Sequence, residues 1–342
     1  NATSTTTHTF IGGLFGGNDG TSAREEILNK GVVNVEGSYT TVGVGGIGGQ
    51  NRMPMNAAKN EAAVNGKASA SSAISAGGLF GYHVRHYYKN AKEGIVMEGG
   101  NGPLIDCVNN GKVTVEGVNS GGSAHVGGIA RQGQNDMIGC INNGEIEVKG
   151  SFKSSIYVGG LITVNSACLR EDCVNNGNIN VSANAGDSTT TGSDVFIGGI
   201  CYSGGSNTTY RRCVNNGDIT FTGKAANCAR FGGLIANVET KDKTNNIEYC
   251  ENHGDITMSG TGSAYAGGTQ RFGGFCAQFT NGTVKILGGF KNTGNITYAG
   301  TQNSTTGVSL GGFIGGNDGT GVFSASSTGN IINEGRITYS GK

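Results

Sequence analysis

Apolar and polar residues alternate with a period of two in short segments that recur along the whole chain. The clearest segments follow an Asn-x-Gly motif, as in Val113-Thr-Val115, Ile146-Glu-Val148 and Ile179-Asn-Val181. A period of two is typical of a strand with one buried face, whereas an amphipathic helix would show a period of about 3.6 residues. Each Asn-x-Gly motif therefore predicts a strand whose apolar side chains face inward.

A second motif, a Gly-Gly pair between apolar residues, alternates strictly with the first. The glycine of Asn-x-Gly stands at 31, 66, 111, 144, 177, 217, 254, 294 and 335, and the Gly-Gly pairs begin at 12, 45, 77, 127, 159, 198, 232, 273 and 311. Paired glycines suit a bend or a close backbone approach, where a Cβ atom would clash. A third apolar stretch, such as Met137 to Ile141, leads into the next Asn-x-Gly.

Nine cycles of these motifs predict an all-β repeat fold, a right-handed parallel β-helix or solenoid of about nine rungs with three short strands per rung. The expected hand follows from the rule that parallel crossovers are right-handed in about 98% of cases. A flatter roll, in which each half-repeat forms its own rung, is disfavoured because the two halves differ chemically. We expect residues 1–342 to form one solenoid domain with an irregular insertion at 82–103. Residues 54–63, which begin with proline and are rich in helix formers, predict a short helix.

Two columns of the repeat invite a chemical interpretation but fit a structural one better. Free cysteine behaves as a small hydrophobe, and no Cys-x2-Cys spacing of the zinc type occurs, so we expect a buried thiol column and no metal site. Stacked asparagine amides can bond from rung to rung, so we expect the asparagines to form a structural ladder. The residues in these two columns are Cys107, Cys140, Cys173, Cys213 and Cys250, and Asn109, Asn142, Asn175, Asn215 and Asn252. Other repeats place Ile27, Ala62, Phe290 and Ile331 at the cysteine position.

Composition and charge narrow the class of function. The chain has 342 residues, 65 of them glycine, and 24 Lys and Arg balance 24 Asp and Glu, so the formal net charge is zero. The basic stripe typical of nucleic-acid binders is missing, and no run of about 18 apolar residues could span a bilayer. We therefore expect no nucleic-acid partner and no membrane insertion. The common hydrolase, metalloprotease and phosphate-loop motifs are also missing, so the sequence predicts no catalytic residue and no cofactor.

The insertion at 82–103 is the strongest sequence candidate for a specific contact. It gathers His83, Arg85, His86, Tyr87 and Tyr88 within six positions. Insertions in solenoids tend to map to loops on one face, often the binding face. These rings and hydrogen-bond donors predict a loop that binds a sugar or a protein. A capping or packing loop is the alternative.

Several of the Gly-Gly segments resemble the GLUG repeat. Gly-Gly-Leu-Phe-Gly at 12–16 and 77–81 and Gly-Gly-Phe-Ile-Gly at 311–315 match its glycine-leucine-hydrophobic-glycine core. The Cys-Val-Asn-Asn-Gly units look like its Asn-Cys-x-x-x-Gly continuation with Asn and Cys in a different order, and the middle repeats replace the final core glycine with Ala130, Ile162 or Cys201. The resemblance covers about residues 10–340. It implies a bacterial surface or secreted protein whose repeats act as stalk or adhesion modules, and it supplies no catalytic residues.

These observations favour a non-catalytic β-solenoid, secreted or on the cell surface, that serves cell adhesion or acts as a stalk. Its expected partners are a host glycan or an extracellular protein, together with further domains of the same chain. The alternative from another class is a carbohydrate-active β-helix enzyme, either a polysaccharide lyase or a hydrolase. That enzyme would need an acidic or Arg/Lys-lined groove built across neighbouring rungs.

Overall fold

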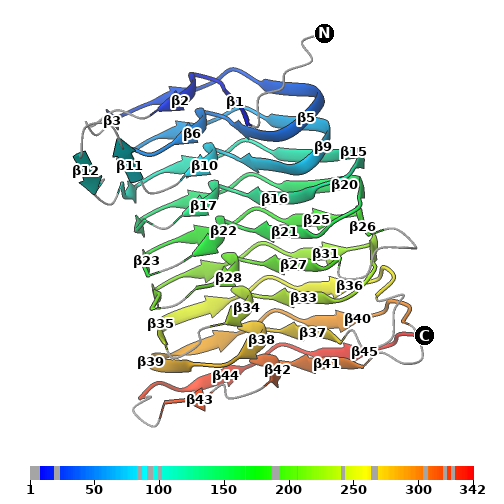
Figure 1. The fold of residues 1–342 in the computed structure, drawn as a ribbon. Coiled ribbons are helices and arrows are strands. Elements are labelled where there is room, and N and C mark those ends of the chain that lie inside the picture. The colour runs from blue at the N-terminus through cyan, green and yellow to red at the C-terminus, as the bar shows by residue number, and fades with distance from the viewer. Residues whose placement is uncertain are drawn as a thin grey trace.

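The chain folds into an all-β parallel helix whose coils stack along one axis (Figure 1). The computed structural model describes residues 8–18, 24–83, 87–90, 95–98, 102–133, 135–165, 167–186, 193–205, 207–239, 243–262, 269–302, 307–318, 322–324 and 328–342. Within these ranges every regular element is a strand. None of them contains a helix that could cross a membrane.

Three parallel sheets, named A, B and C, run along the axis. Sheet B has one strand in each coil: β2 (Phe15–Asn18), β6 (Gly48–Asn51), β10 (Phe80–His83), β17 (Ala130–Gly133), β22 (Ile162–Asn165), β28 (Cys201–Gly204), β34 (Ile235–Glu239), β38 (Cys276–Thr280) and β42 (Ile314–Asp318). These nine strands confirm the nine predicted rungs, one for each full repeat.

Sheet A receives two halves from a coil, which consist of one long strand or of two or three short ones. Its strands are β1 (Thr9–Gly12), β5 (Val33–Gly45), β9 (Val64–Gly77), β15 (Val113–Ser120), β16 (Ser123–Gly127), β20 (Ile146–Phe152), β21 (Ile156–Gly159), β25 (Ile179–Val181), β26 (Asn184–Ala185), β27 (Val195–Gly198), β31 (Ile219–Phe221), β32 (Lys224–Ala225), β33 (Ala229–Gly232), β36 (Ile256–Met258), β37 (Gln270–Gly273), β40 (Ile296–Tyr298), β41 (Val308–Gly311) and β45 (Ile337–Tyr339).

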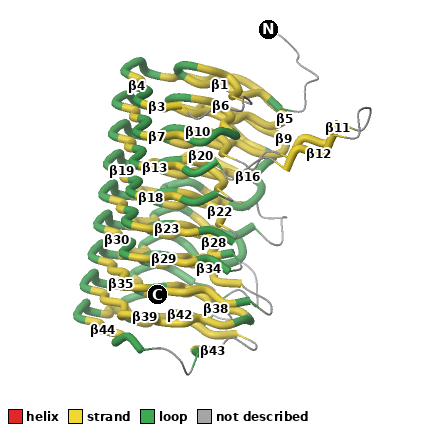
Figure 2. Tube along the Cα trace, turned by 90° about the vertical axis from the view of Figure 1, so that its left-hand side faces the viewer, coloured by secondary structure: helices red, strands yellow, loops and turns green. Residues whose placement is uncertain are grey.

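Sheet C leads each coil back to the next Asn-x-Gly turn, as Figure 2 shows from its side. Its strands are β3 (Arg24–Glu25), β4 (Leu28–Asn29), β7 (Met55–Asn56), β8 (Lys59–Asn60), β13 (Leu104–Ile105), β14 (Val108–Asn109), β18 (Met137–Ile138), β19 (Ile141–Asn142), β23 (Leu169–Glu171), β24 (Val174–Asn175), β29 (Thr209–Arg211), β30 (Val214–Asn215), β35 (Thr244–Asn252), β39 (Thr283–Asn292), β43 (Val322–Phe323) and β44 (Ile331–Asn333).

Three sheets correspond to the three predicted strands of a rung, but sheet C is split in most coils. In the split coils the gap holds a residue in left-handed conformation just before the cysteine position, with φ of 52° at Asp106, 53° at Asp172 and 49° at Arg212. In β35, which is not split, Tyr249 has a φ of 53° and the strand register shifts there instead. Left-handed backbone favours glycine. Because most of these positions are not glycine, the sequence gives no signal for the kink.

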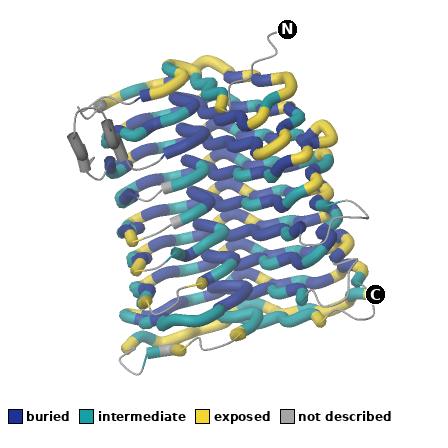
Figure 3. The backbone as a smooth tube through the Cα atoms, in the orientation of Figure 1, coloured by how far each residue is buried: buried dark blue, intermediate teal, exposed yellow. Residues whose placement is uncertain are grey.

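The interior is divided into two apolar cores, both within the buried band of Figure 3. One core lies between the two halves of sheet A, where the rings of Phe221 and Phe231 are 5.5 Å apart. The other lies between sheets B and C, where the rings of Phe275 and Phe290 are 5.4 Å apart. Each coil therefore has two lobes with a waist between them.

The two repeat motifs meet at this waist. A Cβ atom on the second glycine of a pair would lie 2.3 Å from Asn142 Cγ at Gly128, and 2.4 Å from Asn215 Cγ at Gly199. Neither glycine has a positive φ, so close approach rather than backbone conformation requires glycine here. The motifs recur together because the asparagine side chain lies where a Cβ would otherwise stand.

The second coil corrects the predicted register. Asn60 pairs with Asn109 of the next coil, so the motif of this coil is Asn60-Glu-Ala62, with alanine in place of glycine. Gly66, the glycine assigned from sequence, lies four residues later inside β9. The cysteine position of this coil is Ala58 rather than Ala62. The sequence comparison slipped to the next available glycine because the true position lacks one.

The helix predicted for residues 54–63 is also wrong, because this segment forms β7 and β8. Met55 pairs with Leu104, and Lys59 pairs with Val108. Met55 and Ala58 are buried in the second core. Strand pairing satisfies the backbone and buries these side chains, and this tertiary context outweighs the local helix propensity.

The insertion begins later than predicted, because Tyr82 and His83 belong to β10 of sheet B. Beyond them, β11 (Tyr87–Asn90) and β12 (Ile95–Glu98) pair antiparallel as a hairpin. Figures 1 and 2 both show this hairpin outside the wall of coils. The insertion thus adds a separate two-stranded element without changing the stacking of the solenoid.

We expect Gly160→Ala to lower the free energy of unfolding by about 3 kcal/mol, the upper range for overpacking. Its Cβ would lie 1.9 Å from Gly199 O and 2.6 Å from Asn175 Cγ. Gly66→Ala is the matched control, because the nearest atom to its Cβ is Val44 Cγ2 at 3.9 Å. Urea denaturation measures both variants, and equal stability would contradict the packing described for the waist.

Candidate functional site

The asparagine ladder runs through the waist of all nine coils. Each Nδ2 donates to the Oδ1 of the next asparagine at 2.7–2.9 Å. The same Nδ2 also donates to a backbone oxygen two residues later, as from Asn142 to Gly144 at 2.9 Å. The ladder comprises Asn29, Asn60, Asn109, Asn142, Asn175, Asn215, Asn252, Asn292 and Asn333. Because both amide hydrogens are used within the solenoid, the ladder has a structural role.

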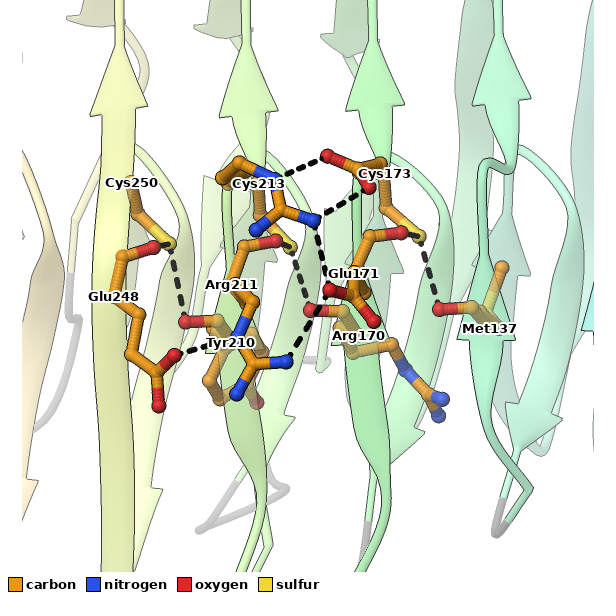
Figure 4. Close-up of polar contacts among 11 residues, drawn as sticks. Met137, Arg170, Glu171, Cys173, Tyr210, Arg211, Cys213, Glu248 and Cys250 are labelled. Carbon is orange, nitrogen blue, oxygen red and sulfur yellow. Dashed lines mark hydrogen bonds and ion pairs between the residues drawn. The ribbon is translucent and has the colours of Figure 1, made fainter.

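The five cysteines of the repeat stack as a buried column in the second core. Their Sγ atoms donate to backbone oxygens of the preceding coil, from Cys173 to Met137 and from Cys213 to Arg170, both at 3.3 Å (Figure 4). All nine cysteines of the chain are buried and carry free thiols. Among the described residues, no group of three or more His, Cys, Asp or Glu is placed to hold a metal ion.

The outer side of sheet C carries charged residues that neutralise one another. Arg211 contacts Glu248 at 2.6 Å and Glu171 at 3.2 Å (Figure 4). Hydrogen bonds from Arg212 and Arg211 hold the pKa of Glu171 below its usual value. These guanidinium groups are therefore already paired, and the sheet C face is a poor candidate for binding an ionic ligand.

His83 lies inside the solenoid, in a second polar ladder at the end of sheet B. Asn18 Nδ2 donates to Asn51 Oδ1 at 2.8 Å, and Asn51 Nδ2 lies 3.1 Å from His83 Nδ1. His83 Nε2 lies 2.8 Å from the Gly102 carbonyl oxygen. Asn135 Nδ2 also lies 3.2 Å from Nε2, so both ring nitrogens have polar partners inside the solenoid. His83 is therefore a packing residue and not part of an exposed contact surface.

The other residues of the predicted loop site give less structural information. Arg85 and His86 lie outside the described residues. Tyr87 and Tyr88 belong to β11, of which the backbone course alone is described. A ligand contact by these four residues stays a prediction.

The outer corner between sheets A and B holds a different cluster, which we name the corner strip. One side consists of outward positions in the second half of sheet A, and these positions stack in register from coil to coil. The other side consists of outward positions of sheet B. The corner strip comprises Phe10, Tyr82, His125, Arg131, Tyr157, Phe196, Tyr202, Arg230 and Arg271.

Aromatic rings form the centre of the corner strip. The ring centroid of Tyr157 is 4.5 Å from that of Tyr202, 4.8 Å from that of His125 and 5.7 Å from that of Phe196. Phe196 also joins a small apolar cluster with Cys228 and Ala236, separate from the two cores. Tyr157 and Tyr202 are only partly buried, so this aromatic cluster presents ring surface to the exterior.

The outer faces of sheets A and B close on each other along this corner. Thr163, Ala236 and Ala277 alternate with inward residues of sheet B and so point away from the core, yet they are fully buried. At Gly81 of sheet B, a Cβ would lie 2.4 Å from Val44 N of sheet A. The corner is therefore tight at its base, and the larger side chains of the strip stand above it.

Three arginines flank the aromatic centre. The Arg131 guanidinium lies 4.3 Å from the ring centroid of Tyr82, and that of Arg230 lies 4.8 Å from that of Phe196. Both contacts have cation–π geometry. In the described part of the chain, neither Arg131 nor Arg230 has an ion-pair partner. Arg271 differs, because it holds the Asp318 carboxylate with both terminal nitrogens.

Buried polar atoms without a hydrogen-bond partner gather at the same corner. They include His125 Nδ1, Thr163 Oγ1, Arg230 Nε, Asn237 Oδ1 and Gln278 Oε1, each without a partner among the described residues. An unmet buried donor or acceptor costs about 1–3 kcal/mol, so such atoms are few in folded proteins. Because these atoms are buried, they mark imperfect polar packing at the base of the corner and are not themselves open to a ligand.

The titratable groups of the strip are unsuited to proton transfer at neutral pH. Burial lowers the pKa of His125 to about 3, with a further contribution from the charge of Arg131. Burial raises the pKa of Tyr202 to about 12. His125 is therefore neutral and Tyr202 protonated at neutral pH, whereas an acid–base catalyst works best with a pKa near the working pH. The side chains of the strip can stack on rings of a ligand, donate hydrogen bonds and attract negative charge.

A signal for the corner strip does exist in the sequence. The residue two positions before each Gly-Gly pair is Phe10, His125, Tyr157, Phe196, Arg230 or Arg271 in six of the nine repeats. Large aromatic residues are uncommon in a column that faces solvent, whereas basic residues are expected there. The partner column from sheet B, with Arg131 and Tyr202, could not be joined to it without knowing that the two sheets meet at this corner.

We expect Asn175→Ala to lower the free energy of unfolding by about 3 kcal/mol. The change leaves Asn142 Nδ2, Asn215 Oδ1 and the Gly177 oxygen without their bonds to Asn175 in a buried setting, and unmet buried groups cost about 1–3 kcal/mol each. Asn176→Ala is the control, because Asn176 makes a similar interstrand bond on the exposed surface. Urea denaturation of both variants gives the comparison, and an equal loss would argue against a special role of the waist.

Acid should destabilise the protein through His83. Burial lowers the pKa of His83 to about 4 from its usual value of 6.5, so the unfolded chain takes up this proton at higher pH than the folded chain does. The free energy of unfolding should thus fall as the pH drops from about 6.5 to 4, by ~3 kcal/mol for this group. Denaturant titrations between pH 7 and 4 measure the fall.

His83→Gln should flatten that pH dependence, because it removes the titrating group. A wild-type slope that persists in His83→Gln would assign the acid sensitivity to other groups.

No protein-family model, curated protein or solved structure matches this chain.

Proposed function

We propose that this chain is a non-catalytic β-solenoid module, secreted or on a bacterial cell surface, that serves adhesion by binding extracellular glycan chains along the corner strip. The observation that carries the proposal is the cluster of Tyr157, Tyr202 and Phe196 on the outside of the solenoid. The resemblance of the repeats to GLUG sequences supports the same setting.

Aromatic faces suit sugar rings because the electron-rich face attracts the weakly positive C–H groups of a pyranose. The partly buried Tyr157 and Tyr202 also carry phenol hydroxyls, which can exchange hydrogen bonds with sugar hydroxyls. A site with large apolar surface and a few directed polar groups is typical of small-ligand recognition.

The direction of the strip favours a chain over a single sugar. Its residues stack in register over successive coils, from His125 through Tyr157 and Phe196 to Arg230. A linear polymer lying along the solenoid axis would meet one of these side chains at each coil, about every 4.8 Å. The strands that hold them are fixed by backbone pairing on both sides, so little ordering would accompany binding.

A protein partner fits this surface less well. Extended peptides commonly bind by adding a strand to the edge of a sheet. The corner strip lies on the faces of sheets A and B, where the backbone groups already bond to neighbouring coils. Recognition here must come from side chains, and rings with scattered polar atoms favour a sugar.

The enzyme alternative has one observation in its favour, the arginines of the strip. A lyase or hydrolase also needs an acid–base pair with suitable pKa values. Among the described residues of the corner, His125 is held neutral and Tyr202 is held protonated by burial, and Asp318 is paired with Arg271. Binding without turnover is therefore the preferred proposal.

The aromatic pair provides a direct test on a glycan array followed by calorimetry with the best ligand. We expect Tyr157→Ala and Tyr202→Ala each to weaken binding roughly tenfold, the loss of about 1.5 kcal/mol of ring contact. Tyr249→Ala is the control, since Tyr249 is 63% exposed on the sheet C side. Unchanged binding in both strip variants, or new chain ends in the bound polysaccharide, would refute the proposal.

A further inference from the structure

We propose that the ligand of the corner strip is an anionic polysaccharide of the uronic acid class, whose carboxylates pair with Arg131 and Arg230. This inference rests on the proposed function and adds the chemical class of the glycan. It starts from two guanidinium groups whose charges the described part of the solenoid leaves unbalanced.

Arg131 and Arg230 are held in place but not neutralised. Each is partly buried and lies on an aromatic ring, Tyr82 for Arg131 and Phe196 for Arg230. No carboxylate among the described residues pairs with either. Elsewhere on this protein arginines find acidic partners, as Arg211 does with Glu171 and Glu248. Two desolvated cations without counter-ions attract an anion strongly.

The spacing of these arginines fits a charged polymer. Arg131 lies in β17 and Arg230 in β33, whose coil is three steps further along sheet B. Three steps correspond to about 14 Å along the axis at the usual strand spacing. The rings of Tyr157 and Tyr202 lie between them. An arginine at each end and aromatic rings between them match a polysaccharide whose sugar rings carry negative groups at regular intervals.

The strip itself shows which anion its arginines hold well. Arg271, next in register after Arg230, binds the carboxylate of Asp318 through both terminal nitrogens, one of them at 2.9 Å. Gln278 Nε2 donates to the same carboxylate at 3.1 Å. This bidentate arrangement is the one in which the guanidinium fork matches a carboxylate. A uronate carboxylate bound to Arg230 would make the same bidentate contact that the Asp318 carboxylate makes with Arg271, one coil away.

Other polyanions fit less well. Nucleic-acid binders carry a broad basic surface, whereas this chain has a net charge of zero, and Arg211 and Arg212 of the sheet C face are paired with acidic residues. An acidic peptide would leave the stacked rings unused. A polymer of sugar rings that carry carboxylates uses both the rings and the arginines of the strip.

Calorimetry with a hexamer of galacturonic acid and with its carboxyl-reduced neutral counterpart tests the proposal. We expect wild-type protein to bind the uronate hexamer more tightly, with an affinity that falls as salt rises. Arg131→Gln combined with Arg230→Gln should reduce uronate affinity roughly 100-fold, about tenfold for each charge-assisted contact. Affinity for the neutral hexamer should fall much less, because it loses no charge-assisted contact. Arg336→Gln removes one exposed charge from the first half of sheet A, away from the strip, and should have no effect.

The outcomes separate this inference from the proposed function. Equal wild-type affinity for the two hexamers, with binding that still depends on Tyr157, would overturn the uronate inference and leave glycan binding standing. If the protein binds no glycan at all, both the uronate inference and the proposed function are overturned. If dextran sulfate binds more tightly than the uronate hexamer, the preferred anionic group is a sulfate and not a carboxylate, and the uronate class is refuted. The comparison of hexamers on wild-type protein remains decisive if the double variant fails to fold.

Discussion

The contact between the asparagine ladder and the second glycine of each Gly-Gly pair is the constraint on which the rest of each coil depends. It brings two turns of the coil together and divides the interior into two narrow cores. A side chain larger than hydrogen at Gly128 or Gly199 would displace the asparagine. The displaced amide would then lose its bonds to the coils above and below. A clash within one coil is thereby transmitted along the axis.

Much of this fold could be predicted from the sequence because each coil repeats the same constraint. Alternation after Asn-x-Gly predicted strands, and nine strict cycles predicted nine coils, one for each full repeat. The asparagine and cysteine columns could be assigned inward because other coils place apolar residues at the cysteine position. The prediction failed where a coil departs from the pattern. In the second coil, Ala62 replaces the glycine, so both the register and the helix at 54–63 were wrong.

The candidate site could not be predicted in the same way, because it depends on how sheets A and B turn against each other. His83 was selected for its chemistry and proved to be buried in a polar ladder. Tyr157 and Tyr202 are 45 residues apart in the sequence and meet only because the Gly-Gly turn folds the outer faces together. Period-two patterns distinguish inside from outside, but they contain no information about which outer faces converge.

The asparagine ladder also gives the solenoid a direction. From Asn29 to Asn292 every Nδ2 of the ladder donates to the Oδ1 of the following coil, so the amide dipoles all point the same way along the axis. Aligned dipoles add, as peptide dipoles do in a helix. A coil inserted or removed in the middle must therefore keep its amide in this orientation to preserve the chain of hydrogen bonds. The solenoid can therefore change length only by whole coils. Each coil gained or lost would shift the outer residues that precede it, relative to those that follow it, by one strand spacing along the axis. The packing of the interior would stay the same.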